Sequence, residues 1–238
     1  MAKVQTDWNV RWHGPIQHLA DNLWWVDGAL PNMSLKRTMV IVRLADGRLV
    51  IHNAIALAAE AMQALERWGV PAFLIVPNGS HRLDAPAYKH RYPALRVFCP
   101  SGARKKVEEV VAVDGTYEDF PSDGTVRFET LHGVAESEGA MIVHSPDGES
   151  VVLNDAMFNM DTKRDPLGFL ITTVFGSAPG PRVSRLAKWA FIKDKQALRE
   201  DFARYADLPD LVRVIVAHEK VASGPSARQA LQSAMQYL

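Results

Sequence analysis

The chain has 238 residues, and 47% of them are hydrophobic, which is enough to build a substantial core in one large domain or two small ones. Its 27 Lys and Arg balance 27 Asp and Glu, so no net positive field would hold a nucleic acid or an anionic membrane, although local basic patches are compatible with this balance. The single cysteine, Cys99, excludes an internal disulfide and any CxxC metal motif.

The N-terminal residues and the hydropathy of the chain predict its location. Residues 1–7 lack the apolar core of a secretory signal, and no apolar run approaches the roughly 20 residues of a membrane span. We therefore expect a cytoplasmic protein with a small-molecule partner and with neither a nucleic acid nor a membrane as partner.

The first half of the chain reads as strand, helix and strand. Residues 1–38 carry four of the six Trp, either as a cover for one edge of the core or as an aromatic lip on a substrate cleft. A strand is expected at 23–26, followed by a hairpin of 38–44 and 48–52 around Asp46-Gly47. A helix at 54–68 and a strand at 72–76 then predict a layered α/β fold.

The second half continues this alternation. The expected elements are helices at 86–92, 102–111, 194–205 and 226–237, strands at 94–99, 126–131 and 211–216, and a hairpin of 140–144 and 150–154. Between them, residues 158–181 are rich in Gly and Pro, and we expect an irregular excursion over the surface that is a candidate flap over a cleft.

Polar residues follow the predicted strand 72–76, where the apolar run stops at Pro77. Loops after such buried strands are common places for ligand-binding residues. Asn78, Ser80, His81 and Asp84 all lie in this loop. His81 is either a metal ligand or an exposed turn residue, and Asp84 is either a ligand or a cap for the helix that begins near Pro86.

Three later strands end in possible metal ligands: His132, Asp155 and His218. Imidazole and carboxylate groups bind Zn²⁺ or Fe²⁺ while leaving a position for water, whose pKa then falls far enough to supply hydroxide near neutral pH. Each residue taken singly is equally compatible with a solvated strand end. Their shared position predicts one site.

The order of these segments resembles the metallo-β-lactamase superfamily of metal-dependent hydrolases over roughly residues 23–224. Leu131-His132-Gly133-Val134 through Gly139 is similar to the third-histidine turn of that family, Asn154-Asp155 to its bridging aspartate, and Ala217-His218 to its final histidine. The resemblance implies a four-layer αββα sandwich, here as a single domain over residues 1–238, with the site at one edge of two sheets.

The family motif His-x-His-x-Asp-His falls on residues 77–84. This alignment puts Asn78, Ser80, Arg82 and Leu83 where His, His, Asp and His are expected, and Arg82 would place a cation beside any metal. The resemblance therefore implies a divergent branch with a reduced, mononuclear site. A Pro-Asn-x-x-His pattern in the same loop is similar to such a branch, for which the resemblance supplies no activity.

Two functions follow as hypotheses. In the first, His81, His132, Asp155 and His218 bind one Zn, Fe or Mn ion, and the protein hydrolyses an ester, lactone, thioester or phosphoester. Asp155 then has a catalytic as well as a metal-binding role, Asn78 donates a hydrogen bond to the developing oxyanion, and Ser80, Arg82 and Asp84 contact the substrate.

In the second hypothesis, the fold is kept but the metal centre is lost. The protein then binds a small ligand or a partner without metal, and Asn78, Ser80 and Arg82 recognise a small anion in the cleft. A third possibility is that the aromatic N-terminal segment and residues 158–181 form the interface of a homodimer without catalysis.

Overall fold

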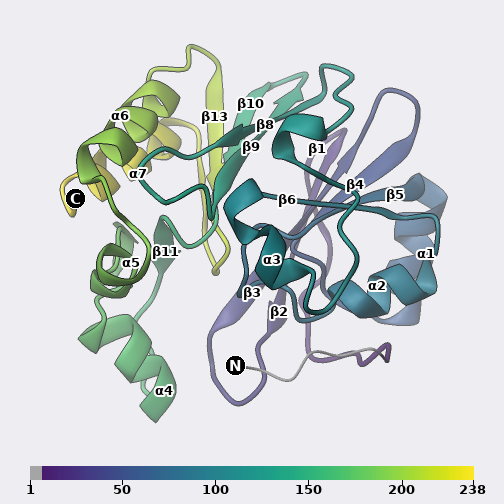
Figure 1. Cartoon of the computed structure of the whole chain (residues 1–238), viewed down its shortest axis with the longest axis horizontal. Coiled ribbons are helices and arrows are strands. Elements are labelled where there is room, and N and C mark those ends of the chain that lie inside the picture. Colours follow the sequence, from purple (N-terminus) through teal and green to yellow (C-terminus); the bar gives the residue numbers. More distant parts are fainter. Residues whose placement is uncertain (1–6) are drawn as a thin grey trace.

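Two β-sheets lie face to face in the computed structural model of the chain, which describes residues 7–238 (Figure 1). One sheet has seven strands in the order β1-β2-β3-β4-β5-β6-β7, and the other has five in the order β14-β13-β10-β9-β8. Helices α1, α2 and α3 flank the first sheet, and α6 and α7 flank the second (Figure 1). The predicted αββα sandwich is confirmed.

The first sheet and its helices are built by residues 17–116. Its strands are β1 (Gln17–Ala20), β2 (Leu23–Ala29), β3 (Lys36–Arg43), β4 (Arg48–His52), β5 (Val70–Ile75), β6 (Arg96–Cys99) and β7 (Gly115–Thr116). Its helices are α1 (Ala59–Trp68), α2 (Ala85–Arg91), the short 3₁₀ turn η1 (Ser101–Ala103) and α3 (Arg104–Val107). The 3₁₀ turn η2 (Tyr117–Asp119) leads to the second sheet.

The second sheet and its helices follow. Its strands are β8 (Val126–Thr130), β9 (Gly139–Ser145), β10 (Gly148–Val152), β13 (Leu211–Ile215) and β14 (Val221–Ser223), and its helices are α6 (Lys195–Ala206) and α7 (Pro225–Met235). Between β10 and α6 lie β11 (Phe158–Met160), α4 (Pro166–Phe169), the π-helical turn η3 (Leu170–Val174), β12 (Gly180–Arg182) and α5 (Arg185–Ala190).

Alternation along the strands produces the layers. In β5, Phe73 and Ile75 pack between the two sheets, whereas Leu74 and the following Val76 pack against the helices on the outer face. Successive side chains of a strand point to opposite faces, so a strand that is apolar at every position needs cover on both sides. The uninterrupted apolar run of β5 therefore places it in the middle of the sandwich.

Both predicted hairpins are present, but the helix expected at 102–111 is shortened to the 3₁₀ turn η1 and the four-residue helix α3, which ends at Val107. Strands β3 and β4 pair antiparallel, as do β9 and β10, while β4, β5 and β6 run parallel. The helix expected from residue 54 begins at Ala59 instead. Residues 54–57 are buried and non-helical, and three of their side chains belong to the core between the first sheet and its helices.

The segment 158–181 is less irregular than its composition predicts. Strand β11 pairs antiparallel with β12, so that Met160 lies opposite Gly180 near the two ends of the segment. Between these strands, α4 and η3 form a continuous helical stretch. Asp165 caps α4 by accepting a hydrogen bond from Gly168 N at 3.0 Å. Among the described residues, no helix has the length and apolar character needed to cross a membrane.

Helix α6 has a side-chain cap that gives a testable contribution to stability. Asp194 Oδ1 accepts hydrogen bonds from Gln196 N at 2.9 Å and Ala197 N at 3.1 Å. We expect Asp194→Ala to lower the free energy of unfolding by about 1 kcal/mol, because it leaves two amide groups at the helix start without this acceptor. Urea unfolding measures the change. Gln196→Ala, an exposed change in the same turn, should have a smaller effect.

Candidate metal centre

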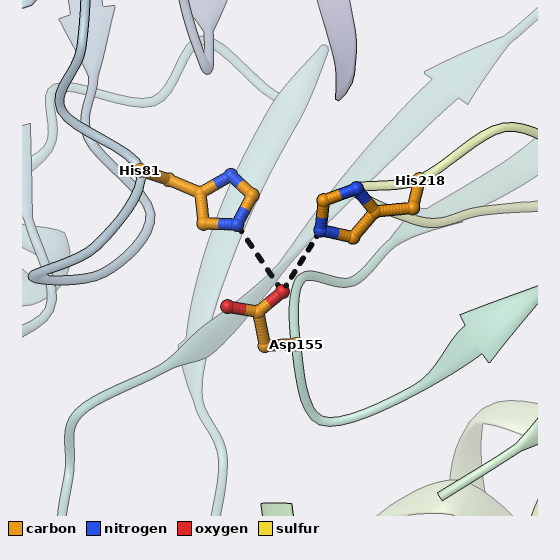
Figure 2. Close-up of side chains that lie close together, drawn as sticks. All are labelled: His81, Asp155 and His218. Carbon is orange, nitrogen blue, oxygen red and sulfur yellow. Dashed lines mark hydrogen bonds and ion pairs between the residues drawn. The ribbon is translucent and has the colours of Figure 1, made fainter. Parts of the chain in front are cut away.

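Three side chains from distant parts of the chain converge at one edge of the two sheets. His81 comes from the loop after β5, Asp155 from the loop after β10 and His218 from the loop after β13 (Figure 2). Asp155 Oδ1 lies 3.2 Å from His81 Nε2 and 3.4 Å from His218 Nε2. One ligand atom from each residue lies within 4.8 Å of the other two. Three of the four predicted strand ends therefore meet.

The loop after β5 is folded so that His81 points inward. Asn78 Oδ1 accepts hydrogen bonds from Ser80 N at 2.8 Å and His81 N at 2.9 Å, a turn that Asn forms readily with its own backbone. The His81 ring then lies edge-on to the His218 ring, with 5.3 Å between the centroids. The polar turn read from the sequence thus places His81 facing inward rather than exposed to solvent.

His218 is held in one tautomer by the backbone. Its Nδ1 lies 2.8 Å from the Lys36 carbonyl oxygen, which can only accept, so Nδ1 carries the hydrogen. Nε2 is the atom that faces Asp155 (Figure 2). The Phe158 ring stacks on the imidazole at 5.7 Å. A histidine fixed in this way by its second nitrogen is the arrangement typical of metal ligands.

Behind these ligands lies a buried carboxylate, Glu138. Its Oε1 accepts hydrogen bonds from Asn78 Nδ2 at 2.6 Å and from Asp155 N at 3.2 Å, and its Oε2 accepts one from Ala156 N at 2.7 Å. Asn78 Nδ2 also donates to Asp155 Oδ2 at 3.0 Å. Glu138 and Asn78 therefore fix both the backbone and the carboxylate of Asp155.

Burial and charge push the pKa values of these groups apart. Burial, together with the charge of Asp155, raises the pKa of Glu138 to about 8. Burial would also raise the pKa of Asp155, but the charges and hydrogen bonds of His81 and His218 hold it well below its ordinary value. Burial lowers the pKa of His52, and the charge of His81 lowers it further, to about 3. His52 is thus neutral beside the cluster.

The donor set fits a divalent transition metal. Two imidazole nitrogens with one carboxylate oxygen form a ligand set that suits Zn²⁺, Fe²⁺ or Mn²⁺. Two of the three separations between candidate ligand atoms, 3.2 and 3.4 Å from Asp155 Oδ1, are close to the roughly 3.3 Å expected between two ligands of the same tetrahedral Zn²⁺, and all three lie within 4.8 Å. His218 already has its other nitrogen engaged, so its Nε2 can accept a metal in place of a proton.

The structure places His132 elsewhere, and its assignment to the same ion is corrected. Its side chain is 73% exposed, and its Nδ1 lies 3.1 Å from Asp201 Oδ1 on α6. Strand β8, which precedes it, lies two strands from β10 at the edge of the sheet, whereas β10 and β13 are neighbours. The end of β8 is therefore about 10 Å to the side of β10, and His132 turns toward Asp201 rather than toward the cluster of His81, Asp155 and His218.

Three other predicted roles also change. Both hydrogens of the Asn78 amide have partners, so Asn78 is a positioning residue rather than an oxyanion donor. Arg82 donates to the Lys106 carbonyl and to Glu109 at 2.8 Å, a contact on the side of α3 rather than in the cluster. Asp84 is buried in an ion pair with Arg37 and has no side-chain cap at α2, so it is not a substrate contact.

A small cavity adjoins His81 and His218, and Ser80 is the one predicted substrate-binding residue that lines it. Its volume is about 140 Å³. Its lining residues are Leu30, Arg37, Asn53, Ser80, His81, Leu83 and His218. Ser80 therefore lies at the cavity, whereas Arg82 and Asp84 do not line it. The cavity is large enough for a compact chemical group, which would lie directly against His81 and His218.

The sequence pattern did not indicate Glu138, because that pattern marks polar residues that follow strands, whereas Glu138 precedes one. It precedes β9, and β9 is antiparallel to β10, so the start of β9 lies beside the end of β10. The signal in the sequence that could have indicated Glu138 is an acidic residue directly before an apolar strand of a predicted hairpin. Arg37 was missed because it lies inside β3, where nothing local marks a buried cation.

Comparisons with known proteins identify the fold. No protein-family model matches the chain, and no curated protein matches it. A structure of DIM-1 metallo-β-lactamase exposed to ceftazidime is similar, with a TM-score of 0.63 and 11% identity over 96% of this chain and 98% of that one. A metallo-β-lactamase from Erythrobacter litoralis, with β-mercaptoethanol in its active site, gives 0.62 and 12% over 94% and 96%.

The chain therefore has the metallo-β-lactamase fold. At these identities the similarity concerns the fold alone, and the chemistry has to be argued from the residues of this site.

Proposed function

We propose that the protein is a metal-dependent hydrolase with one metal ion held by His81, Asp155 and His218. The observation that carries this proposal is the convergence of two imidazole nitrogens and one carboxylate oxygen within 4.8 Å. The ion is Zn, Fe or Mn, and the substrate is an ester, lactone, thioester or phosphoester. When bound, such an ion supplies Lewis acidity and lowers the pKa of a coordinated water.

The residues around the ligands set their positions. Asn78 and Glu138 orient Asp155, and the Lys36 carbonyl orients His218. The cavity beside His81 and His218 binds the reacting end of the substrate, with Ser80 as a hydroxyl that can hydrogen-bond to it. A cavity of about 140 Å³ accommodates only a compact group, so the remainder of a larger substrate would extend outward.

Elemental analysis of the purified protein tests the metal centre. After expression in metal-supplemented medium, we expect about one equivalent of Zn, Fe or Mn in the parent, because a complete three-ligand set is present. His81→Ala and His218→Ala should each lose most of it. His132→Ala is the matched control and should retain the parent stoichiometry, since that imidazole pairs with Asp201.

Two results would contradict the metal centre. One is a parent protein that cannot be loaded with Zn²⁺, Fe²⁺ or Mn²⁺, which would favour a metal-free protein that binds a small ligand or a partner. The other is a loss of metal in His132→Ala equal to that in His218→Ala, which would mean that these three residues are not the ligands.

Hydrolysis is tested separately with the metal-loaded protein. A panel of ester, lactone, thioester and phosphoester substrates should include at least one that the parent cleaves and Asp155→Asn does not. If a stoichiometrically loaded parent cleaves none of the four classes, the metal centre would stand but its proposed reaction would be wrong.

A further inference from the structure

Large apolar side chains are concentrated on the surface of one segment, residues 166–190, which contains α4, η3 and α5. Ten large hydrophobic side chains are exposed in the described part of the chain, and six of them lie here. These six, which we call the apolar patch, are Leu167, Phe169, Leu170, Val174, Leu186 and Trp189. Trp189 is 81% exposed. In Figure 1, α4 and α5 project beside the sandwich at the lower left.

The helical stretch of α4 and η3 presents the reverse of a normal surface pattern. Leu167, Leu170 and Val174 recur at helical spacing and are exposed, whereas Gly168 and Thr172 between them are buried. A surface helix ordinarily turns its apolar stripe toward the core. Here the small residues face the protein and the large apolar ones face outward, as expected for a surface that is covered by something else.

Helix α5 adds to the same surface. Leu186 and Trp189 are three residues apart and therefore share one face of this helix. Arg185 N donates to the Phe175 carbonyl at 2.8 Å, and Arg185 Nη1 donates to the Val174 carbonyl at 3.3 Å. The end of η3 thus contacts the start of α5, which joins the two helical segments into one patch.

Positive charge is concentrated in the segment that contains the apolar patch, although the whole chain is neutral. Residues 161–195 contain seven Lys or Arg and three Asp. Only Lys163 is paired, with Glu219, and the other six form no ion pair within the described residues: Arg164, Arg182, Arg185, Lys188, Lys193 and Lys195. Burial lowers the pKa of Lys188, and the charges of Lys195 and Arg185 lower it further, which places these cations near one another.

The three aspartates of this segment are already engaged. Asp161 pairs with Lys220 at 2.6 Å, Asp165 caps α4, and Asp194 caps α6. The surplus of cations is therefore available to a negatively charged partner. The zero net charge of the chain conceals this local surplus, which is balanced by acidic residues elsewhere.

We propose that the apolar patch docks on the surface of a lipid bilayer that contains anionic lipids. Exposed Trp, Phe and Leu next to Lys and Arg are the combination that enters the boundary between headgroups and acyl chains, and each nearby cation adds electrostatic attraction to anionic lipid. A second copy of the chain fits less well, since a two-fold dimer through this face would bring the six unpaired cations of one copy against the same six of the other.

Sedimentation with vesicles tests this docking surface. The parent should bind phosphatidylcholine vesicles that contain phosphatidylglycerol, should release them as salt is raised, and should not bind vesicles of phosphatidylcholine alone. Trp189→Ala should weaken binding about tenfold or more, through lost apolar burial. Lys193→Ala and Lys195→Ala should each weaken it about fivefold.

Matched changes elsewhere on the surface complete the test. Val70→Ala removes an exposed apolar side chain at the start of β5, and Lys105→Ala removes an exposed cation of α3 that forms no ion pair with residues 7–238. Both should bind as the parent does. The proposal is overturned if the parent ignores the anionic vesicles, or if the control variants lose as much binding as Trp189→Ala. A dimer that Trp189→Ala disperses, without vesicle binding, would instead assign the patch to a second copy.

Discussion

Asp84→Ala should lower the free energy of unfolding by about 3–5 kcal/mol, which would be a large part of the stability of a domain. The side chains of Asp84 and Arg37 are 1% and 4% exposed, and they form an ion pair. Asp84 Oδ2 also accepts a hydrogen bond from Ala56 N at 2.9 Å. Removing the carboxylate leaves a buried guanidinium without its counter-charge, and that uncompensated charge is the main cost. Urea unfolding of the purified variant measures it.

An exposed pair of the same chemistry is the control. Arg48 Nε lies 2.6 Å from Asp46 Oδ2, but 41% and 50% of these two side chains are exposed. Asp46→Ala should therefore cost far less than Asp84→Ala, because solvent screens the exposed pair. The double change Arg37→Met with Asp84→Leu should recover most of what Asp84→Ala loses, because no buried charge remains. Equal losses for Asp84→Ala and Asp46→Ala would show that burial of the pair is not what matters.

The sequence predicted the parts of the site that depend on local signals. An apolar run followed by polar residues marks the end of a buried strand, and this led to His81, Asp155 and His218. The sequence does not show which strand ends are neighbours. That depends on strand order in the second sheet, where β13 lies beside β10 and β8 lies two strands away. His132 satisfied the local pattern and failed because of this order.

Roles that depend on long-range partners could not be read from the sequence. Asn78 looked like a free amide donor, but its partners Glu138 and Asp155 follow 60 and 77 residues later. Asp84 looked like a helix cap or ligand, and its partner Arg37 lies 47 residues earlier in β3. Side-chain pairs of this kind join residues that are distant in the sequence and are brought together by the fold, so the spacing of residues along the chain does not predict them.

Glu138→Ala is expected to affect both the metal affinity and the fold. Glu138 accepts hydrogen bonds from Asn78 Nδ2, Asp155 N and Ala156 N, all of them buried or half-buried, and the change would leave them unpaired. Each unpaired donor costs about 1–3 kcal/mol, so the free energy of unfolding should fall by about 3–5 kcal/mol. Loss of a residue that orients a ligand should also weaken metal binding by about 10–100-fold.

Chelator competition and urea unfolding of the metal-free protein separate these two effects. Glu138→Gln keeps the shape and one acceptor oxygen, so it should recover much of the stability while metal binding stays weakened, because the amide cannot accept every hydrogen bond that orients Asp155. Glu136→Ala is the control, since Glu136 is exposed and its side chain contacts Ser101 at 3.0 Å outside the cluster. If Glu138→Ala and Glu136→Ala bind the metal with equal affinity, Asp155 does not depend on Glu138 for its orientation. The proposed positioning role of Glu138 would then be wrong.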